Sequence, residues 1–88
     1  MNANPVHAPG WRPCPFEIGR EYRVTQSIRS LRDCFDAGEV VTFIRAGYSV
    51  YYSMTGYFFT DIHGTIRAFD VADDVADEEW QAAFERGG

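Results

Sequence analysis

Short runs of β-branched and aromatic residues, separated by glycines, fill the middle of the chain. Gly38, Gly47, Gly56 and Gly64 follow one another at intervals of nine, nine and eight residues. Glycine readily adopts the positive φ angles of tight turns, and the runs between these glycines have the length and composition of strands. The five predicted strands are residues 22–26, 40–44, 48–52, 57–60 and 65–69. Turns at this regular spacing predict an antiparallel meander.

Five strands of this length around one small core are expected to curl, and closure removes the exposed edges of a sheet. The sequence therefore predicts a mainly β fold, a small five-stranded antiparallel SH3-like barrel formed by residues 16–88. The chain of 88 residues, of which 45% are hydrophobic, is long enough for one such core. It is too short for a substrate cleft between two domains.

The C-terminal segment has the spacing of a helix. Trp80, Ala83 and Phe84 lie at i, i+3 and i+4, so they would form one apolar stripe. Asp77 is placed to cap the start of such a helix, and a pair of glycines follows its end. We expect one helix, over about residues 77–86, that packs across an open end of the barrel.

The N-terminal arm, residues 1–15, contains all four prolines of the chain. Because proline fixes φ and lacks an amide donor, we expect this arm to be extended. Trp11 then docks either on the barrel or on a partner, because an exposed indole ring leaves a large apolar area in water. The polar segment 27–37 has helix-like spacing of its few apolar residues, but a long loop with anchoring side chains fits it equally.

Charge is distributed unevenly along the chain. The net charge is −5, and residues 61–88 carry eight acidic and two basic residues, whereas residues 1–32 carry two acidic and five basic ones. An acidic surface repels nucleic-acid phosphates and suits a basic partner. Six acids lie within residues 70–79, namely Asp70, Asp73, Asp74, Asp77, Glu78 and Glu79. They form either a solvated approach to the predicted helix or a patch that meets a basic groove.

Apolar patterning also bears on the compartment. No apolar run approaches the roughly 18 residues of a membrane span, and the N-terminus lacks the apolar centre of a secretory signal. Two cysteines, Cys14 and Cys34, are too few for the disulfide framework of a small secreted scaffold. We therefore expect a cytoplasmic protein with reduced thiols and no membrane contact, although a bridge between these two cysteines stays open.

Residues suited to catalysis or metal binding are sparse. Asp61 and His63 could project two ligands from one strand face, but His63 precedes a predicted turn glycine, and two ligands do not complete a metal site. His7 lies in the arm without a carboxylate near it in sequence. The sequence predicts no catalytic residue, no metal site and no cofactor, and hence no enzyme.

An aromatic-rich hairpin and the acidic segment are the candidate contacts for a protein partner. A small barrel cannot bury every ring of the hairpin, so we expect some rings to stay exposed as anchors for a partner. The candidate partner-binding residues are Tyr51, Tyr57, Phe58, Asp73, Asp74, Glu78 and Glu79. The arm or the helix covering these rings is the alternative that the sequence leaves open.

Four arginines near the start of the chain provide a second candidate surface. Arg20, Arg23, Arg29 and Arg32, with exposed rings nearby, could form a face that binds single-stranded nucleic acid. The chain has no lysine to support such a face, and its acids oppose it. Contact with another protein is therefore the predicted function, with single-stranded nucleic acid as the alternative.

Four motifs occur in a fixed order along the chain. They are Phe16-x-x-Gly19-x-x-Tyr22-x-Val24, Gly38-Glu39-x-x-Thr42-Phe43, Tyr48-x-x-Tyr51 and Gly56-x-x-Phe59. Over about residues 16–69 this order resembles a family of short bacterial proteins of unknown function. The resemblance implies a small SH3-like β domain held by turn glycines and core aromatics, without catalytic residues. In size and acidity the chain is also similar to immunity proteins, which neutralise bacterial toxins.

Overall fold

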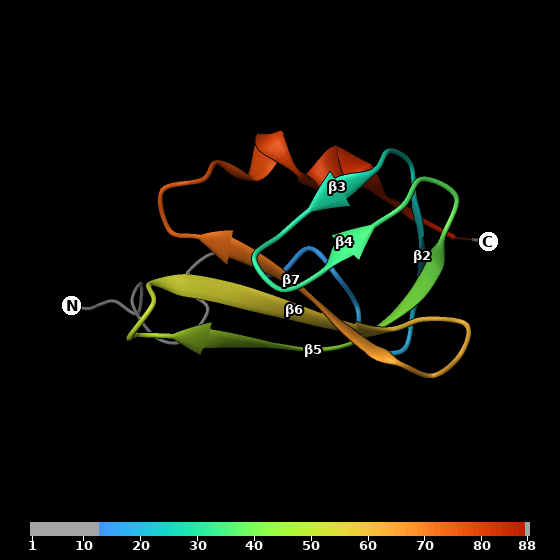
Figure 1. The fold of residues 1–88 in the computed structure, drawn as a ribbon, viewed down its shortest axis with the longest axis horizontal. Helices are drawn as coiled ribbons and strands as arrows, with labels where there is room; N and C mark the ends of the chain where they lie inside the picture. The colour runs from blue at the N-terminus through green and yellow to red at the C-terminus, as the bar shows by residue number, and fades with distance from the viewer. Residues whose placement is uncertain (1–12, 88) are drawn as a thin grey trace.

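The computed structural model of the chain describes residues 13–87. Its main element is a five-stranded antiparallel sheet in the order β7-β6-β5-β2-β8 (Figure 1). The strands are β2 (Glu21–Val24), β5 (Val40–Ser49), β6 (Met54–Thr60), β7 (Ile66–Ala72) and β8 (Phe84–Arg86). A two-stranded ribbon consists of β3 (Ile28–Arg29) and β4 (Cys34–Phe35). The expectations for His7, Trp11 and most of the arm fall on residues 1–12, outside the described part.

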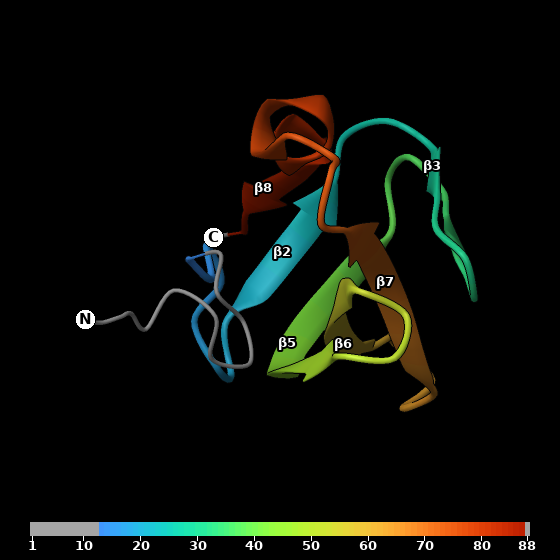
Figure 2. The same cartoon turned by 90° about the vertical axis from the view of Figure 1, so that its left-hand side faces the viewer.

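The prediction of a mainly β, antiparallel fold is confirmed, but the closed barrel is wrong. Within residues 13–87, β7 and β8 are the two edges of a curled sheet and do not pair with each other (Figure 2). Side chains of the ribbon occupy the β7 edge instead. The Ser30 hydroxyl donates to the Ala68 carbonyl at 3.0 Å, and the Asp33 carboxylate accepts from the Ala68 amide at 2.8 Å. The backbone groups of Ala68 on this edge are therefore satisfied without closure.

The segment 27–37, which the sequence left open, is this ribbon and its connections. It contains no helix. Leu31, at the tip of the ribbon, is 70% exposed, whereas Phe35 is fully buried. The ribbon therefore packs on the core through Phe35, whereas Leu31 at the ribbon tip is exposed to solvent.

Only two of the four predicted turn glycines lie in turns. Gly38 and Gly64 have positive φ angles of 96° and 79° between strands. Gly47 and Gly56 lie inside β5 and β6, directly opposite each other. The predicted strand 48–52 is also wrong. Its first two residues complete β5, and the others form the turn of the β5–β6 hairpin. Gly56 in a strand is explained by the close approach of other side chains, described below.

The predicted C-terminal helix is also wrong. Two single 3-10 turns, η1 (Asp77–Glu79) and η2 (Gln81–Ala83), lead directly into β8, which pairs with β2. The predicted apolar stripe is nevertheless buried, and it comprises Trp80, Ala83 and Phe84. A helix this short is marginal on its own, whereas a strand in this position gains backbone hydrogen bonds along the free edge of β2.

The core between the curled sheet and the C-terminal turns is mostly aromatic. Phe16, which precedes β2, lies at its centre, with six other rings at centroid distances of 5.0 to 5.9 Å. Most of these pairs are edge-to-face, a favoured geometry of aromatic rings. The core covers the inner face of the sheet. The opposite side of β5, β6 and β7 is called the outer face below.

Candidate partner-binding groove

The strand register determines which side chains share the outer face. Three successive rows, from β5 through β6 to β7, are Arg45–Phe58–Ala68, Gly47–Gly56–Asp70 and Ser49–Met54–Ala72. A β-bulge between Phe43 and Arg45 changes the alternation along β5. Phe43 points into the core, and the extra residue turns Arg45 to the outer face. The bulge and the register together bring Arg45 beside a pair of glycines that have no side chains.

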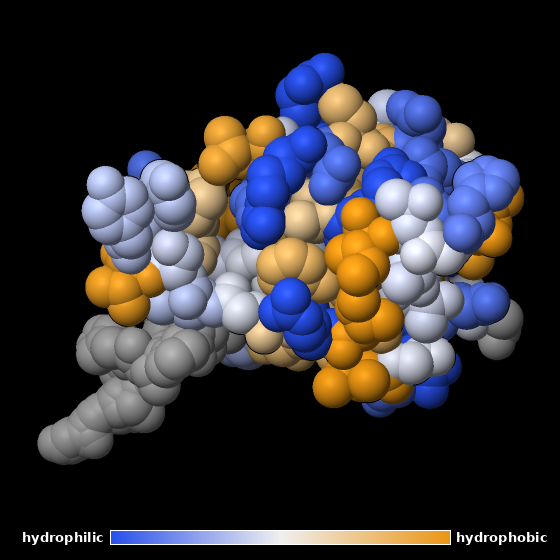
Figure 3. All heavy atoms as spheres, turned by 60° about the horizontal axis from the view of Figure 1, so that its bottom comes forward, coloured by the Kyte–Doolittle hydropathy of each residue, from blue (hydrophilic) through white to orange (hydrophobic). Residues whose placement is uncertain are grey.

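The glycine row leaves a hollow of about 550 Å³ in the outer face, which we call the groove. Its floor is formed by backbone, and longer side chains from the ribbon, β5 and the hairpin surround it. The principal lining residues are Leu31, Arg32, Arg45, Gly47, Tyr52 and Gly56. Figure 3 shows this side of the molecule, where apolar side chains in orange and tan lie next to hydrophilic ones in blue.

Arg32 and Asp70 form one wall of the groove. Arg32 Nη2 donates to Asp70 Oδ1 at 2.5 Å, and its Nε donates to Oδ2 at 3.1 Å. The Asp70 side chain is only 3% exposed. The hydrogen bond to Asp70 raises the pKa of Arg32, so the guanidinium stays charged. A Cβ at Gly56 would lie 3.0 Å from Arg32 Nη2 and 3.3 Å from Asp70 Oδ1, so any larger residue there would force this ion pair to shift.

Two guanidinium groups lie over the ring of Phe58. The Cζ atom of Arg45 is 4.1 Å from the ring centroid, and that of Arg32 is 5.1 Å from it. Both distances are typical of cation–π contacts. Arg32 also has a carboxylate partner, whereas Arg45 forms no ion pair or hydrogen bond with a side chain of residues 13–87. The groove therefore contains one positive charge that the described chain leaves unmatched.

The β5–β6 hairpin extends the groove with exposed apolar surface. Val50, Tyr51 and Tyr52 are 80%, 87% and 65% exposed. The two tyrosine rings contact each other edge-to-face, with centroids 4.8 Å apart. At the base of the hairpin, the Tyr48 hydroxyl donates to Asp73 Oδ2 at 2.6 Å, and this hydrogen bond raises the pKa of Tyr48. The tip is thus held on a fixed base while its rings face solvent.

The predicted aromatic contacts are only partly brought together. Tyr51 is exposed at the hairpin tip, and Phe58 lines the groove. The assignment of Tyr57 as a contact residue is wrong, because its side chain is fully buried on the inner face of β6, where it packs against Trp80 at 5.2 Å. Alternation along β6 decides this, since Tyr57 shares its face with the buried residues Thr55 and Phe59.

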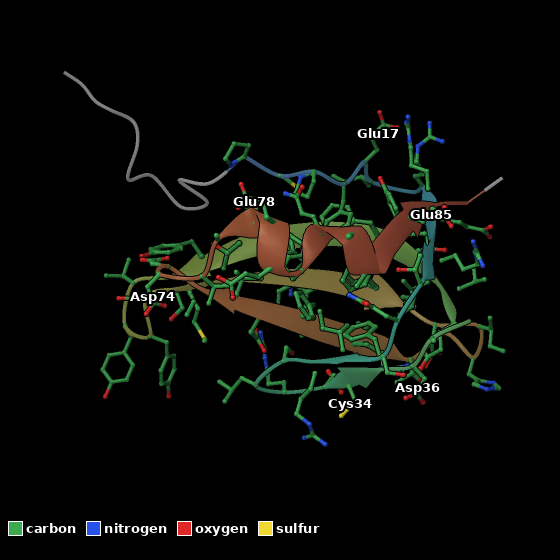
Figure 4. The ribbon with its side chains drawn as sticks, turned by 90° about the horizontal axis from the view of Figure 1, so that it is seen from above. Glu17, Cys34, Asp36, Asp74, Glu78 and Glu85 are labelled. Carbon is green, nitrogen blue, oxygen red and sulfur yellow. The ribbon has the colours of Figure 1, made fainter. Side chains whose placement is uncertain are left out.

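The predicted acidic contacts separate into two groups. Asp73 bonds Tyr48 and belongs to the base of the hairpin. Asp74, Glu78 and Glu79 are exposed and form no ion pair with residues 13–87. Figure 4 shows Asp74 at the hairpin end of the molecule and Glu78 farther along, on the C-terminal turns. These three carboxylates lie outside the groove.

Most of the predicted nucleic-acid face is engaged in ion pairs. Arg20 Nε lies 2.6 Å from Glu17 Oε1, Arg23 pairs with Glu85, and Arg32 with Asp70. Arg29, on β3, is exposed and has no carboxylate partner within the described chain. These arginines therefore do not form one free basic surface.

The turn interpretation of Asp61 and His63 is confirmed. Asp61 Oδ1 accepts the amide hydrogens of His63 and Thr65 at 2.9 and 3.0 Å, and the His63 side chain is exposed. Across residues 13–87, no three His, Cys, Asp or Glu side chains gather as a metal site would require. Cys14 and Cys34 are both free and exposed, which answers the open question of a bridge between them.

Arg67 links this turn to the start of β5. Its Nη1 lies 2.9 Å from Glu39 Oε1 and 3.2 Å from Asp61 Oδ2. Burial by itself would raise the pKa of both carboxyl groups. At Glu39, this effect of burial is outweighed by hydrogen bonds and by the positive charge of Arg67. At Asp61, it is outweighed by hydrogen bonds from backbone amides together with Arg67. Both pKa values therefore lie below their ordinary range, and the cluster holds one end of the sheet.

The groove residues Gly47, Gly56 and Arg45 are not among the predicted site residues. One signal for the glycines exists in the sequence, because they are equally distant from the centre of the Tyr51–Tyr52 turn and therefore face each other in a hairpin. Arg45 carries no such signal. Simple alternation places it on the same face as Phe43, and only the bulge reverses it.

Comparison with known proteins finds no family model, no curated protein and no solved structure that matches the chain. The resemblance to short bacterial proteins and to immunity proteins therefore stays a prediction. Across the described residues, no helix has both the length and the apolar composition needed to cross a bilayer.

Proposed function

We propose that the protein is a non-enzymatic binding module that acts by contact with another protein through the groove and the adjacent hairpin tip. The observation that carries this proposal is the position of three exposed apolar residues, Val50, Tyr51 and Tyr52, beside a hollow floored by glycine. Exposed aromatic side chains next to a concavity are the usual anchors of protein interfaces.

The element order supports an SH3-like architecture as part of the same proposal. The first long connection folds as the β3–β4 ribbon, and 3-10 turns precede the last strand, which returns beside β2. In this arrangement the ribbon tip and the β5–β6 hairpin both line the groove. A partner segment could therefore contact Leu31 and Tyr52 at once.

Site-specific photo-cross-linking in the native host tests the proposal. We expect p-benzoylphenylalanine at Tyr51 to capture one protein, and the same group at Ile62, which is 78% exposed at the opposite end of the sheet, to capture none. The captured protein must then bind in purified form, and Gly47→Val must weaken that binding. Gly47 has space for a side chain, with its nearest neighbour 3.8 Å from a Cβ. Binding that is unaffected by Gly47→Val would contradict the proposal.

Ala46→Val is the matched control for this substitution. Ala46 is the exposed neighbour of Gly47 on the opposite face of β5. The change adds an equally branched side chain to the same strand without filling the groove. We expect this variant to bind the purified partner with unchanged affinity.

Toxin neutralisation is a sharper version of the same proposal. Asp74, Glu78 and Glu79 are exposed and form no ion pair with residues 13–87, and together with the net charge of −5 they favour a basic partner surface that extends beyond the groove. Coexpression with toxin genes encoded next to this gene should rescue growth, and replacing the three acids by Asn or Gln should abolish the rescue. If no neighbouring gene is toxic, the neutralising role falls, whereas the binding module is judged by the cross-linking experiment.

Single-stranded nucleic acid is the second candidate function. It is favoured by one observation, the stack of Arg45 on Phe58 next to Tyr52, since bases stack on aromatic rings and on guanidinium groups. Binding to a labelled oligothymidine that weakens steeply with salt and is lost in Arg45→Glu would favour this function over protein contact.

A further inference from the structure

Arg45, at the edge of the groove, donates no hydrogen bond to another side chain within residues 13–87. Its guanidinium stacks on Phe58 at 4.1 Å, which occupies one face of the group. The N–H donors of a guanidinium point outward in its own plane, so stacking leaves them available to a ligand. Arg32, which also lies over the Phe58 ring, has Asp70 as its acceptor. Arg32 therefore already has a carboxylate acceptor, whereas Arg45 has none within the described residues.

We infer that the groove binds an extended segment of a partner protein through one acidic side chain flanked by apolar ones, which rests on the function proposed above. A carboxylate placed against Arg45 can accept two parallel hydrogen bonds from it, the strongest common pairing of an arginine. Leu31, Met54 and Tyr52 provide apolar surface for the neighbouring side chains. The floor at Gly47, where the nearest atom would lie 3.8 Å from an added Cβ, gives the partner backbone room to approach closely.

The charges around the groove favour a single carboxylate over a polyanion. Arg32 is neutralised by Asp70, and Asp73 lies at the base of the hairpin. One unmatched guanidinium compensates one negative charge, whereas a nucleic-acid strand brings a phosphate with every nucleotide and needs several basic contacts. The net charge of −5 also opposes a polyanion. A peptide with one acid satisfies Arg45 without adding uncompensated charge.

Titration of the isotope-labelled full chain with defined probes tests this inference. The first probe is a blocked pentapeptide with a central glutamate between two leucines, and the second has glutamine in its place. We expect the glutamate peptide to shift the amide signals of Gly47 and Gly56 and the Nε–H signal of Arg45. The glutamine peptide should bind at least about tenfold more weakly, because a charge-assisted bidentate pair is lost. Arg45→Gln should reduce the affinity for the glutamate peptide by a similar factor.

The possible outcomes distinguish two questions, namely whether the ligand must be acidic and whether it binds in the groove. Equal binding of both peptides would overturn the acidic preference and leave the groove as an interface. Oligothymidine that shifts the same signals more strongly than the glutamate peptide would also overturn it, in favour of nucleic acid. If neither peptide shifts the groove signals, the inference is wrong, and the proposed function is decided by cross-linking at Tyr51. Gly47→Val should abolish the shifts, whereas Ala46→Val should leave them unchanged.

Discussion

The two faces of β6 differ in burial, although their residues alternate along a single strand. On the inner face, Thr55, Tyr57 and Phe59 are at most 1% exposed and are packed among other rings. On the outer face, Gly56 and Phe58 lie under two arginines and beside a hollow. The inner face is stabilised by the burial of apolar area, whereas the outer face is organised by an ion pair and by the absence of side chains. The buried core and the proposed binding groove are therefore formed by alternate residues of the same strand.

The largest effect is expected from Phe59→Ala on the inner face. Phe59 is fully buried and contacts Phe16, Phe43 and Phe84. Removal of the ring should lower the free energy of unfolding by about 3–5 kcal/mol, through lost burial and the cavity left behind. Urea unfolding measures this change. Met54→Ala on the outer face is the control, and a loss of equal size there would show that the two faces do not differ as described.

Gly56→Ala should have the next largest effect. The added methyl group would meet Arg32 and Asp70, so the ion pair must shift, and overpacking of this kind costs about 1–3 kcal/mol. Gly47→Ala is the matched control in the opposite strand, because its nearest atom is 3.8 Å away. We expect that variant to be as stable as the parent protein or slightly more stable, since alanine restricts the unfolded chain. Equal losses in the two variants would contradict the account of the groove wall.

Acidification should weaken the Arg67 cluster. The pKa values of Glu39 and Asp61 are lowered in the folded protein from ordinary values of 4.5 and 3.8. A group with a depressed folded pKa contributes stability above its unfolded pKa and loses that contribution as the pH falls. The urea midpoint should therefore decrease as the pH falls below these ordinary values. In Arg67→Met the decrease should be smaller, and an unchanged pH dependence in that variant would contradict the assignment.

The smallest effect on stability is expected at the hairpin tip. Tyr51 is 87% exposed and contacts only Tyr52 among the rings of residues 13–87. Tyr51→Ser should change the free energy of unfolding by less than about 0.5 kcal/mol. Its affinity for the purified partner should nevertheless fall at least about tenfold, as expected for an aromatic anchor. Retained affinity would place the contact elsewhere on the outer face.

Features that depend on residues close together in the chain could be predicted from the sequence, whereas features that depend on contacts between distant residues could not. The apolar stripe of Trp80 and Phe84 is buried as expected, although the segment forms 3-10 turns and a strand. Tyr57 is buried although an exposed ring was expected, because alternation within a strand does not say which of its two faces packs on the core. The groove could not be derived, since it requires Arg32 from the ribbon, Asp70 from β7 and the bulge in β5 to come together.

The amino-acid sequence by itself determined that this chain forms antiparallel strands around an aromatic core, because strand propensity and burial depend on short-range alternation and composition. Tertiary structure decided which glycines are turns, which edges stay open and which face Arg45 occupies. These properties depend on register, and register is set by contacts between residues far apart in the chain, where no local pattern records them.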